Sequence, residues 1–260
     1  MEQIIYVVDA FTSRLFGGNP AAVCPLENWL EESLMQKIAA ENNLSETAFF
    51  VKNKDRYHIR WFTPAEEVDL CGHATLASSF VYFNFINPGA ARIVFDSQSG
   101  ELIVDKEGDV LSLNFPSQKP VPVDNPEKNL IDAFDVKPVE VLMGTKRFLV
   151  YEKEETIRNM KPDMSLLKQL RGDGVIITAP GKEVDFVSRF FAPNIGIDED
   201  PVTGSAHTHL IPYWSEKLGK KKMTALQVSS RVGELECEDL GERVKISGKA
   251  VLYSQGKIFI

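Results

Sequence analysis

One sequence pattern occurs twice in this chain, and it constrains the fold more than any single residue does. The first copy reads Arg-Trp-Phe-Thr-Pro at 60–64 and continues, seven residues later, with Cys-Gly-His-Ala-Thr at 71–75. The second copy reads Arg-Phe-Phe-Ala-Pro at 189–193 and continues, at the same spacing, with Asp-Pro-Val-Thr-Gly-Ser at 200–205. An offset of 129 residues in a chain of 260 predicts one folding unit used twice, with two related halves facing each other across a cleft.

The elements that flank the two copies are expected to follow one order. In the first half, a helical apolar pattern stops at Asn42-Asn43, and the stretch 72–83 is apolar on most sides, as expected of a buried helix. The strands expected in this half cover about 47–51, 57–62, 93–95, 100–104 and 110–115. The second half repeats the order with helices at 166–170 and 203–214 and strands at 174–178, 186–191, 225–228, 233–237 and 244–246. Strands around one buried helix predict an α+β fold in which a curled sheet wraps that helix, once per half.

A proline-rich segment divides the two halves. Four prolines stand within the eleven residues 116–126. Because proline has a fixed φ angle and no backbone N–H, we expect neither a helix nor a sheet ladder there. The predicted division is an N-terminal half at 1–117, a linker at 118–126 and a C-terminal half at 127–260.

Composition excludes several classes of function. The net charge is −8, and no run of lysine and arginine is long enough to follow a phosphate backbone, so nucleic acid is not an expected partner. No apolar stretch approaches the ~18 residues needed to span a bilayer, and residues 1–8 are typical of an apolar strand rather than a basic targeting signal. Three cysteines without metal-ligand spacing favour a reduced, cytoplasmic protein without a metal centre.

The two expected buried helices begin at the reactive motifs. Backbone N–H groups in the first turn of a helix lack helical partners, and the helix dipole adds positive charge there. Gly72 and Gly204 would let a ligand approach this backbone closely. Each helix start is therefore a candidate site for a carboxylate. The alternative is that Cys71 and Asp200 only cap their helices, since Asp is among the best N-cap residues.

Four side chains are candidates for chemistry. Glu46 stands where a helix gives way to an apolar strand, so that partial burial would make it a proton shuttle. His73 would be a neutral donor or acceptor at a helix start. Thr203 and Ser205 could bind an acidic ligand or cap, and Ser205 lacks the Gly-x-Ser-x-Gly elbow of a nucleophile.

Together these residues resemble the PhzF-like (phenazine biosynthesis protein-like) isomerase family, which has the diaminopimelate-epimerase fold. The matching stretches are Asp-Ala-Phe at 9–11, Phe-Gly-Gly-Asn-Pro-Ala-Ala-Val at 16–23, Asn-Leu-Ser-Glu-Thr-Ala-Phe at 43–49, Asp-Leu-Cys-Gly-His-Ala-Thr at 69–75 and Asp-Glu-Asp-Pro-Val-Thr-Gly-Ser-Ala-His at 198–207. They occur along the whole chain in family order.

The resemblance implies a function and roles for the candidate residues. Members with a known role isomerise trans-2,3-dihydro-3-hydroxyanthranilate, a small cyclic amino acid, by moving a hydrogen without a cofactor or metal, and a homodimer is usual for the family. Glu46 matches the general acid/base, whereas His73, Asp200 and Ser205 match residues that hold the substrate and assist proton transfer. The residues next to them are expected to line the substrate site: Cys71, Gly72, Thr203 and Gly204.

One departure from the related epimerases bears on the mechanism. Those enzymes use one cysteine from each half as paired acid and base, but here Asp200 stands opposite Cys71. The preferred function is therefore a cofactor-independent isomerase with one base, Glu46, acting on a small carboxylate-bearing metabolite. The alternatives are an epimerase or racemase that uses Cys71, another enzyme class such as a hydrolase or lyase, and a non-catalytic small-molecule-binding protein.

Overall fold

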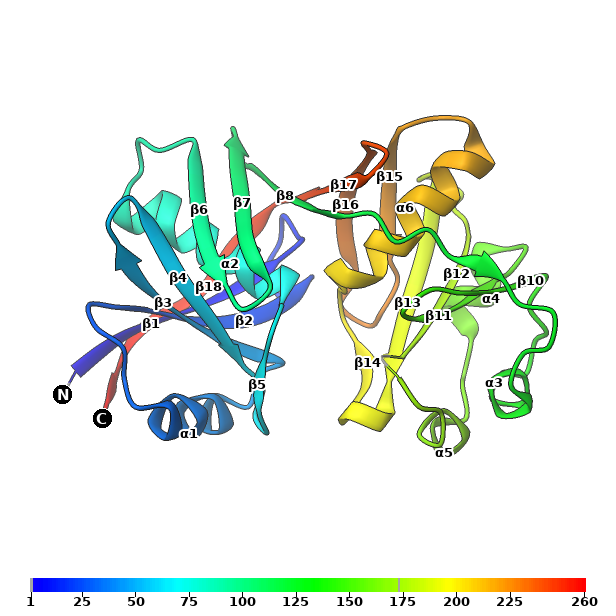
Figure 1. Ribbon diagram of the computed structural model, residues 1–260, viewed down its shortest axis with the longest axis horizontal. Helices are drawn as coiled ribbons and strands as arrows, with labels where there is room; N and C mark the ends of the chain where they lie inside the picture. The colour runs from blue at the N-terminus through cyan, green and yellow to red at the C-terminus, as the bar shows by residue number, and fades with distance from the viewer. Residues whose placement is uncertain (1, 173) are drawn as a thin grey trace. The chain divides into compact units, whose positions relative to one another are not determined.

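The computed structural model describes residues 2–172 and 174–260 and separates the chain into two compact units (Figure 1). Unit 1 contains the residues up to Asn114 together with Ser247–Ile260, and unit 2 contains Phe115–Ile246. Both units are mixed α+β structures in which strands outnumber helices. The predicted fold class, a curled sheet with a central helix in each half, is confirmed.

Unit 1 is built from strands that surround one central helix. Its strands are β1 (Glu2–Ala10), β2 (Asn19–Leu26), β3 (Glu46–Asn53), β4 (Arg56–Phe62), β5 (Glu67–Val68), β6 (Arg92–Ser97), β7 (Gly100–Glu107), β8 (Val110–Pro116) and β18 (Ala250–Phe259). Its helices are α1 (Glu32–Asn42) and α2 (Gly72–Val81), and α2 continues as the π-helix Tyr82–Ile86. Helix α1 stops at the predicted place, because Asn43 adopts the left-handed conformation that commonly ends a helix.

Unit 2 has the same kind of sheet and more short helices. Its strands are β9 (Val121–Pro122), β10 (Glu140–Met143), β11 (Arg147–Val150), β12 (Val175–Pro180), β13 (Phe186–Ala192), β14 (Ile197–Asp200), β15 (Lys222–Gln227), β16 (Gly233–Asp239) and β17 (Arg243–Gly248). Its helices are α3 (Lys128–Asp132), α4 (Glu154–Asn159), α5 (Met164–Leu167), the 3-10 turn Pro193–Ile195 and α6 (Gly204–Leu218).

The strand pairings of the two units repeat each other. In unit 1, β2 and β3 are parallel, β3 and β4 are antiparallel, and β4 and β6 are parallel. In unit 2, β11 and β12 are parallel, β12 and β13 are antiparallel, and β13 and β15 are parallel. The hairpins β6–β7 and β15–β16 also correspond. The sequence repeat therefore reflects one topology built twice.

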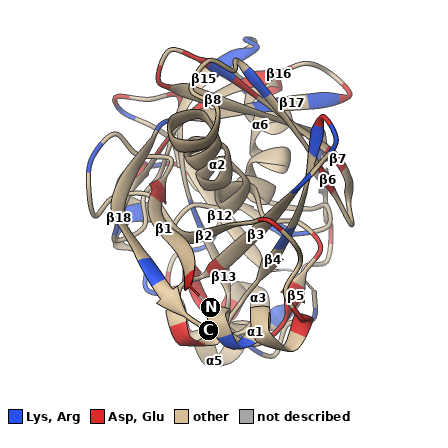
Figure 2. Ribbon diagram, turned by 90° about the vertical axis from the view of Figure 1, so that its left-hand side faces the viewer, with Lys and Arg blue, Asp and Glu red and all other residues tan. Residues whose placement is uncertain are grey.

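Helix α2 is enclosed by the sheet of unit 1. It packs against β1, β2, β3 and β18, and Figure 2 shows it without a charged residue among the surrounding strands. Its buried hydroxyl groups are satisfied locally, because those of Thr75, Ser78 and Ser79 donate to carbonyls four residues earlier. This is the buried helix that the apolar pattern predicted.

Helix α6 of unit 2 contains a proline. Pro212 has no backbone N–H, so the Thr208 carbonyl loses its helical partner. The backbone N–H of Gln118 donates to this carbonyl at 3.0 Å instead. A segment that the sequence assigns to the linker thus completes the hydrogen bonding of the central helix.

The structure differs from the predicted division in two places. Strand β18 pairs with β1 from Glu2 opposite Phe259 to Ala10 opposite Ala250, so the last residues belong to unit 1 and not to the predicted half at 127–260. Within the predicted linker 118–126, β9 pairs with β10 despite Pro122. Proline is tolerated in a strand at a sheet edge, where its missing N–H is not needed.

Among the residues that the structure describes, no helix combines the length and the apolar character required to cross a membrane.

The turn between β1 and β2 depends on a glycine in a close backbone contact. Gly18 has φ +59°, and a Cβ atom placed there would lie 2.0 Å from the Ala10 carbonyl oxygen. Gly108 has the same φ with no atom within 4 Å of such a Cβ. Gly108→Ala should therefore cost only the ~1–2 kcal/mol of left-handed backbone strain, whereas Gly18→Ala should cost roughly 3 kcal/mol or more. Urea unfolding of the two variants measures the difference, and equal losses would contradict it.

Candidate functional site

Two predicted residues of unit 1 meet inside the sheet. Glu46 is the first residue of β3, and His73 is the second residue of α2. The Glu46 Oε2 atom lies 3.0 Å from the His73 Nε2 atom, and neither atom has another hydrogen-bond partner among the described residues. The side chains are 11% and 5% exposed. The structure thus places the expected proton shuttle and the expected histidine in direct contact.

The opposite ring nitrogen of His73 has two further neighbours. The Asn19 Nδ2 atom lies 3.2 Å from His73 Nδ1, and the Cys71 Sγ atom lies 3.5 Å from it. Asn19 is fully buried at the start of β2, and the Ser45 hydroxyl donates to its Oδ1 at 3.4 Å. A continuous polar chain therefore runs through Asn19 and His73 to Glu46.

Burial decides the charge of Cys71, and through it the charge of His73. Burial raises the pKa of the Cys71 thiol to about 11, so this thiol is neutral at neutral pH. Burial lowers the pKa of His73, but negative charges on Cys71 and Glu46 raise it, and with both charged the pKa lies well above its usual value. A neutral Cys71 removes the first of these charges. At neutral pH the Glu46 carboxylate alone then favours a protonated His73 against burial.

The same three residues carry metal-ligating atoms, all within 4.8 Å of one another: Glu46, Cys71 and His73. Their arrangement does not suit one ion, because Glu46 contacts Nε2 of the imidazole and Cys71 contacts Nδ1. One ion binds only one nitrogen of a given ring, so a carboxylate and a thiolate on opposite sides cannot both complete its shell. The cluster fits a hydrogen-bonded chain better than a metal centre.

The backbone of Cys71 caps α2, but its side chain does not. Cys71 occupies the N-cap position, and its carbonyl accepts the first helical hydrogen bond from Thr75. Its side chain makes no capping hydrogen bond, so the expectation that it only caps the helix is wrong for the thiol. Gly72 follows and is half-buried.

In unit 2, Asp200 does not hold the position expected of a helix cap. It is the last residue of β14, and the N-cap of α6 is Thr203. The Thr203 hydroxyl donates to Asp200 Oδ2, and both residues are buried. The capping alternative for Asp200 is therefore wrong, and its carboxylate is held by the residue that begins the helix.

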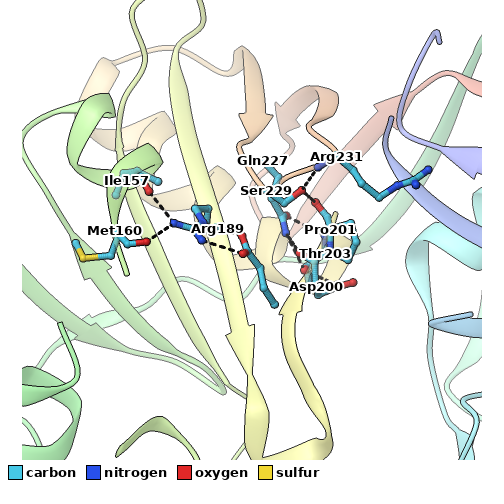
Figure 3. A network of polar contacts seen from close by, with 10 residues as sticks. Ile157, Met160, Arg189, Asp200, Pro201, Thr203, Gln227, Ser229 and Arg231 are labelled. Carbon is cyan, nitrogen blue, oxygen red and sulfur yellow. Dashed lines mark hydrogen bonds and ion pairs between the residues drawn. The ribbon is translucent and has the colours of Figure 1, made fainter. Parts of the chain in front are cut away.

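A buried glutamine organises the turn between β14 and α6 (Figure 3). The Gln227 side chain is fully buried; its Oε1 accepts from the Thr203 N–H at 2.9 Å, and its Nε2 donates to the Asp200 carbonyl at 2.8 Å. The Ser229 hydroxyl donates to the Pro201 carbonyl at 2.9 Å. Three backbone groups of this one turn are thereby satisfied from β15 and the loop after it.

The two arginines that open the repeated pattern have matching environments. Arg60 pairs with Glu67 at 2.6 Å and lies over the Phe62 ring at 5.2 Å. Arg189 pairs with Glu199 at 2.7 Å and lies over the Phe191 ring at 4.9 Å. Figure 3 shows Arg189 also donating to the carbonyl of Ile157 in α4 and to that of Met160 directly after it. Arg60 thus links β4 to β5, and Arg189 links β13 to β14. The arginine position of the repeated pattern therefore has a structural role.

The remaining predicted residues lie in the first turns of α6. Gly204 is buried and Ser205 is exposed, so the Ser205 hydroxyl remains accessible to a ligand. His207 is fully buried and its Nδ1 contacts the Thr203 carbonyl at 2.8 Å, whereas His209 Nδ1 faces the Ser205 carbonyl at 3.3 Å. The two histidines thus contact the carbonyls of different residues.

The structure thus gathers the predicted residues into two groups. Unit 1 brings Glu46, Cys71 and His73 together, and unit 2 brings Asp200 and Thr203 together. That both groups share one cleft stays a prediction. Two further residues take part that sequence reasoning did not single out. Asn19 lies within the matching stretch 16–23 and Gln227 within the expected strand 225–228, and the signal for each is a polar side chain directly beside apolar residues.

Comparison with known proteins gives a consistent set of relatives. The family model described as phenazine biosynthesis-like protein (PhzC-PhzF) matches residues 8–256. A protein of Pseudomonas aeruginosa named as an uncharacterized isomerase is 49% identical over 260 residues, covering all of both chains. The crystal structure of a PhzF-family phenazine biosynthesis protein from Enterococcus faecalis matches with a TM-score of 0.97 and 48% identity, covering all of both chains.

A more distant structure shares the fold alone. The hydroxyproline epimerase from Agrobacterium vitis matches with a TM-score of 0.62 and 8% identity, over 99% of this chain and 92% of that one. This likeness agrees with the epimerase-like architecture predicted for each half.

His207 should make stability depend on pH. Burial lowers its pKa to about 4, against 6.5 in an unfolded chain, so the unfolded state takes up the proton first as the pH falls. Stability contributed by neutral His207 should be complete above pH 6.5 and should decline by about 3 kcal/mol toward pH 4. His207→Asn keeps an N–H donor near the Nδ1 position but does not titrate. Urea unfolding between pH 7 and 4 should therefore show a shallower decline for the variant than for the natural protein, and parallel declines would contradict the assignment.

Proposed function

The chain belongs to the phenazine biosynthesis-like protein (PhzC-PhzF) family, and from this we propose that it is an isomerase moving a hydrogen within a small carboxylate-bearing metabolite. The observation that carries the proposal is the 3.0 Å contact between Glu46 Oε2 and His73 Nε2 inside the sheet of unit 1. A carboxylate held by an imidazole at the end of a buried helix is suited to accept and return a proton.

Glu46 is the proposed single base. It removes a proton from one carbon of the substrate, holds it on the carboxyl group and returns it to another carbon, so the substrate keeps its composition. The electron pair left by the departing proton shifts along the substrate to the carbon that is protonated last. His73 holds the carboxylate in place during both transfers, as an orienting group does for a general base.

Cys71 is less suited to this task. Its thiol has a pKa raised to about 11 by burial, and only the thiolate would act as a base. Its sulfur faces the far side of the imidazole, 3.5 Å from Nδ1. Both features favour one-base isomerisation through Glu46 over racemisation through Cys71.

The start of α6 is the proposed carboxylate-binding element. Its first turn offers backbone N–H groups that the N-cap side chain does not cap, together with the exposed Ser205 hydroxyl, beside the Asp200 carboxylate that Thr203 holds. Gly72 and Gly204 leave the two helix starts open to a ligand. We further propose that the protein works as a cytoplasmic homodimer without a cofactor, as the family resemblance implies.

The proposal predicts exchange of a substrate hydrogen with solvent through Glu46. The protein is incubated in D₂O with trans-2,3-dihydro-3-hydroxyanthranilate, and with small carboxylates that raise its melting temperature. Deuterium incorporation followed by mass spectrometry should fall by ~10²–10⁴-fold in Glu46→Gln, because the amide cannot take up the proton.

The control matched to Glu46→Gln is Cys71→Ala, which should retain deuterium incorporation into the substrate. Loss of exchange in Cys71→Ala together with its survival in Glu46→Gln would assign the chemistry to the thiol and favour an epimerase. Ligand-induced stabilisation without exchange in any variant would identify a binding protein instead.

A further inference from the structure

Asn19 is a fully buried polar residue next to the His73 imidazole. It is the first residue of β2, where it lies opposite Ala10 of β1. Two strand positions later, Ala21 pairs with Glu46 on β3. Asn19 and Glu46 are therefore held on adjacent strands, and the His73 ring contacts both.

The direction of each hydrogen bond follows from the orientation of the Asn19 amide. The Ser45 hydroxyl donates to Asn19 Oδ1, which turns the Asn19 Nδ2 group toward His73 Nδ1. An amide nitrogen donates and cannot accept. His73 Nδ1 must then present its lone pair, so the proton of the neutral ring sits on Nε2 and points to Glu46 Oε2.

We propose that Asn19 is a positioning residue that keeps His73 a neutral imidazole with its proton on Nε2, an inference that rests on the role proposed above for His73 and Glu46. A protonated Nδ1 would face the Asn19 N–H group, donor against donor. Asn19 therefore opposes the imidazolium form that the Glu46 carboxylate favours. The consequence is that Glu46 receives a hydrogen bond from a neutral partner and keeps its capacity to accept a proton from substrate.

A neutral His73 also preserves the basicity of the Glu46 carboxylate. A doubly protonated His73 would form a buried ion pair with Glu46, which would stabilise the carboxylate and weaken it as a base. A neutral N–H donor orients the carboxylate with less loss of basicity. Cys71, on the Nδ1 side, is a neutral thiol and adds no charge to this balance at neutral pH.

The tautomer can be observed directly by NMR of protein labelled with ¹⁵N-histidine. The chain contains four histidines, and the His73 signals are assigned from their loss in His73→Gln. At pH 7 we expect His73 Nδ1 to be unprotonated and Nε2 to carry the proton. A protonated Nδ1 in the natural protein would overturn the proposal without the need for any variant at position 19.

Asn19→Asp reverses the hydrogen bond. An ionised carboxylate only accepts, so Nδ1 should become protonated and the pKa of His73 should rise by at least one unit, a tenfold change in its protonation constant. Asn19→Ser, which retains a small polar group able to donate, should stay closer to the natural protein. An unchanged His73 titration in both variants would overturn the proposal.

The chain provides a matched control in a second asparagine–histidine contact. Asn53 Nδ2 lies 3.1 Å from His58 Nε2 on the exposed hairpin of β3 and β4. Asn53→Asp should alter only the His58 signals and should leave His73 and solvent exchange unchanged. Changes at His73 of the same size as those in Asn19→Asp would indicate a general charge effect and would overturn the specific assignment.

The readouts separate this inference from the proposed function. Asn19→Asp should lower deuterium incorporation by ~10²-fold or more, since the wrong protonation state weakens the base. If the natural protein exchanges no hydrogen but shows the expected tautomer, the proposed function fails and the positioning role stands. If exchange is normal in Asn19→Asp, the positioning role fails and the isomerase proposal stands.

Discussion

Enclosing a helix within a sheet forces every polar atom at its start to find a partner from the protein. Helix α2 is buried on almost all sides, so His73 cannot rely on water for either ring nitrogen. The adjacent strands supply both partners, Asn19 from β2 and Glu46 from β3. The site of unit 1 is thus a consequence of how the core is closed, because a buried polar group left unpaired is costly.

The same requirement is met differently in unit 2. There the turn before α6 has backbone groups to satisfy at both ends, and the side chain of Gln227 bonds to both of them. Duplication has kept the strand pairings and the arginine clamps, whereas the side chains at the helix starts have diverged. One unit carries a carboxylate beside an imidazole, and the other carries a carboxylate beside a hydroxyl.

Much of this organisation was predictable from the sequence, because local signals carry it. The apolar stretch 72–83 and the alternation in the strands identified the central helix and its sheet. Glu46 and His73 were found from their motifs. Strand β18 was not predicted, since its outward-facing residues dilute the alternation and its partner β1 lies at the far end of the sequence. Asn19 was missed for a related reason: its role depends on a contact 54 residues away that no local pattern encodes.

The pairing of β18 with β1 has a consequence for how the chain acquires its structure. Unit 2 is one continuous stretch of sequence, from Phe115 to Ile246, whereas unit 1 is assembled from segments on both sides of it. During synthesis, the strands of unit 2 are all made before β18, and until β18 is made the edge of β1 that it covers has no partner. The Glu46–His73 pair therefore lies in the unit whose sheet around α2 is completed only by β18, which follows all of the other described strands in the sequence.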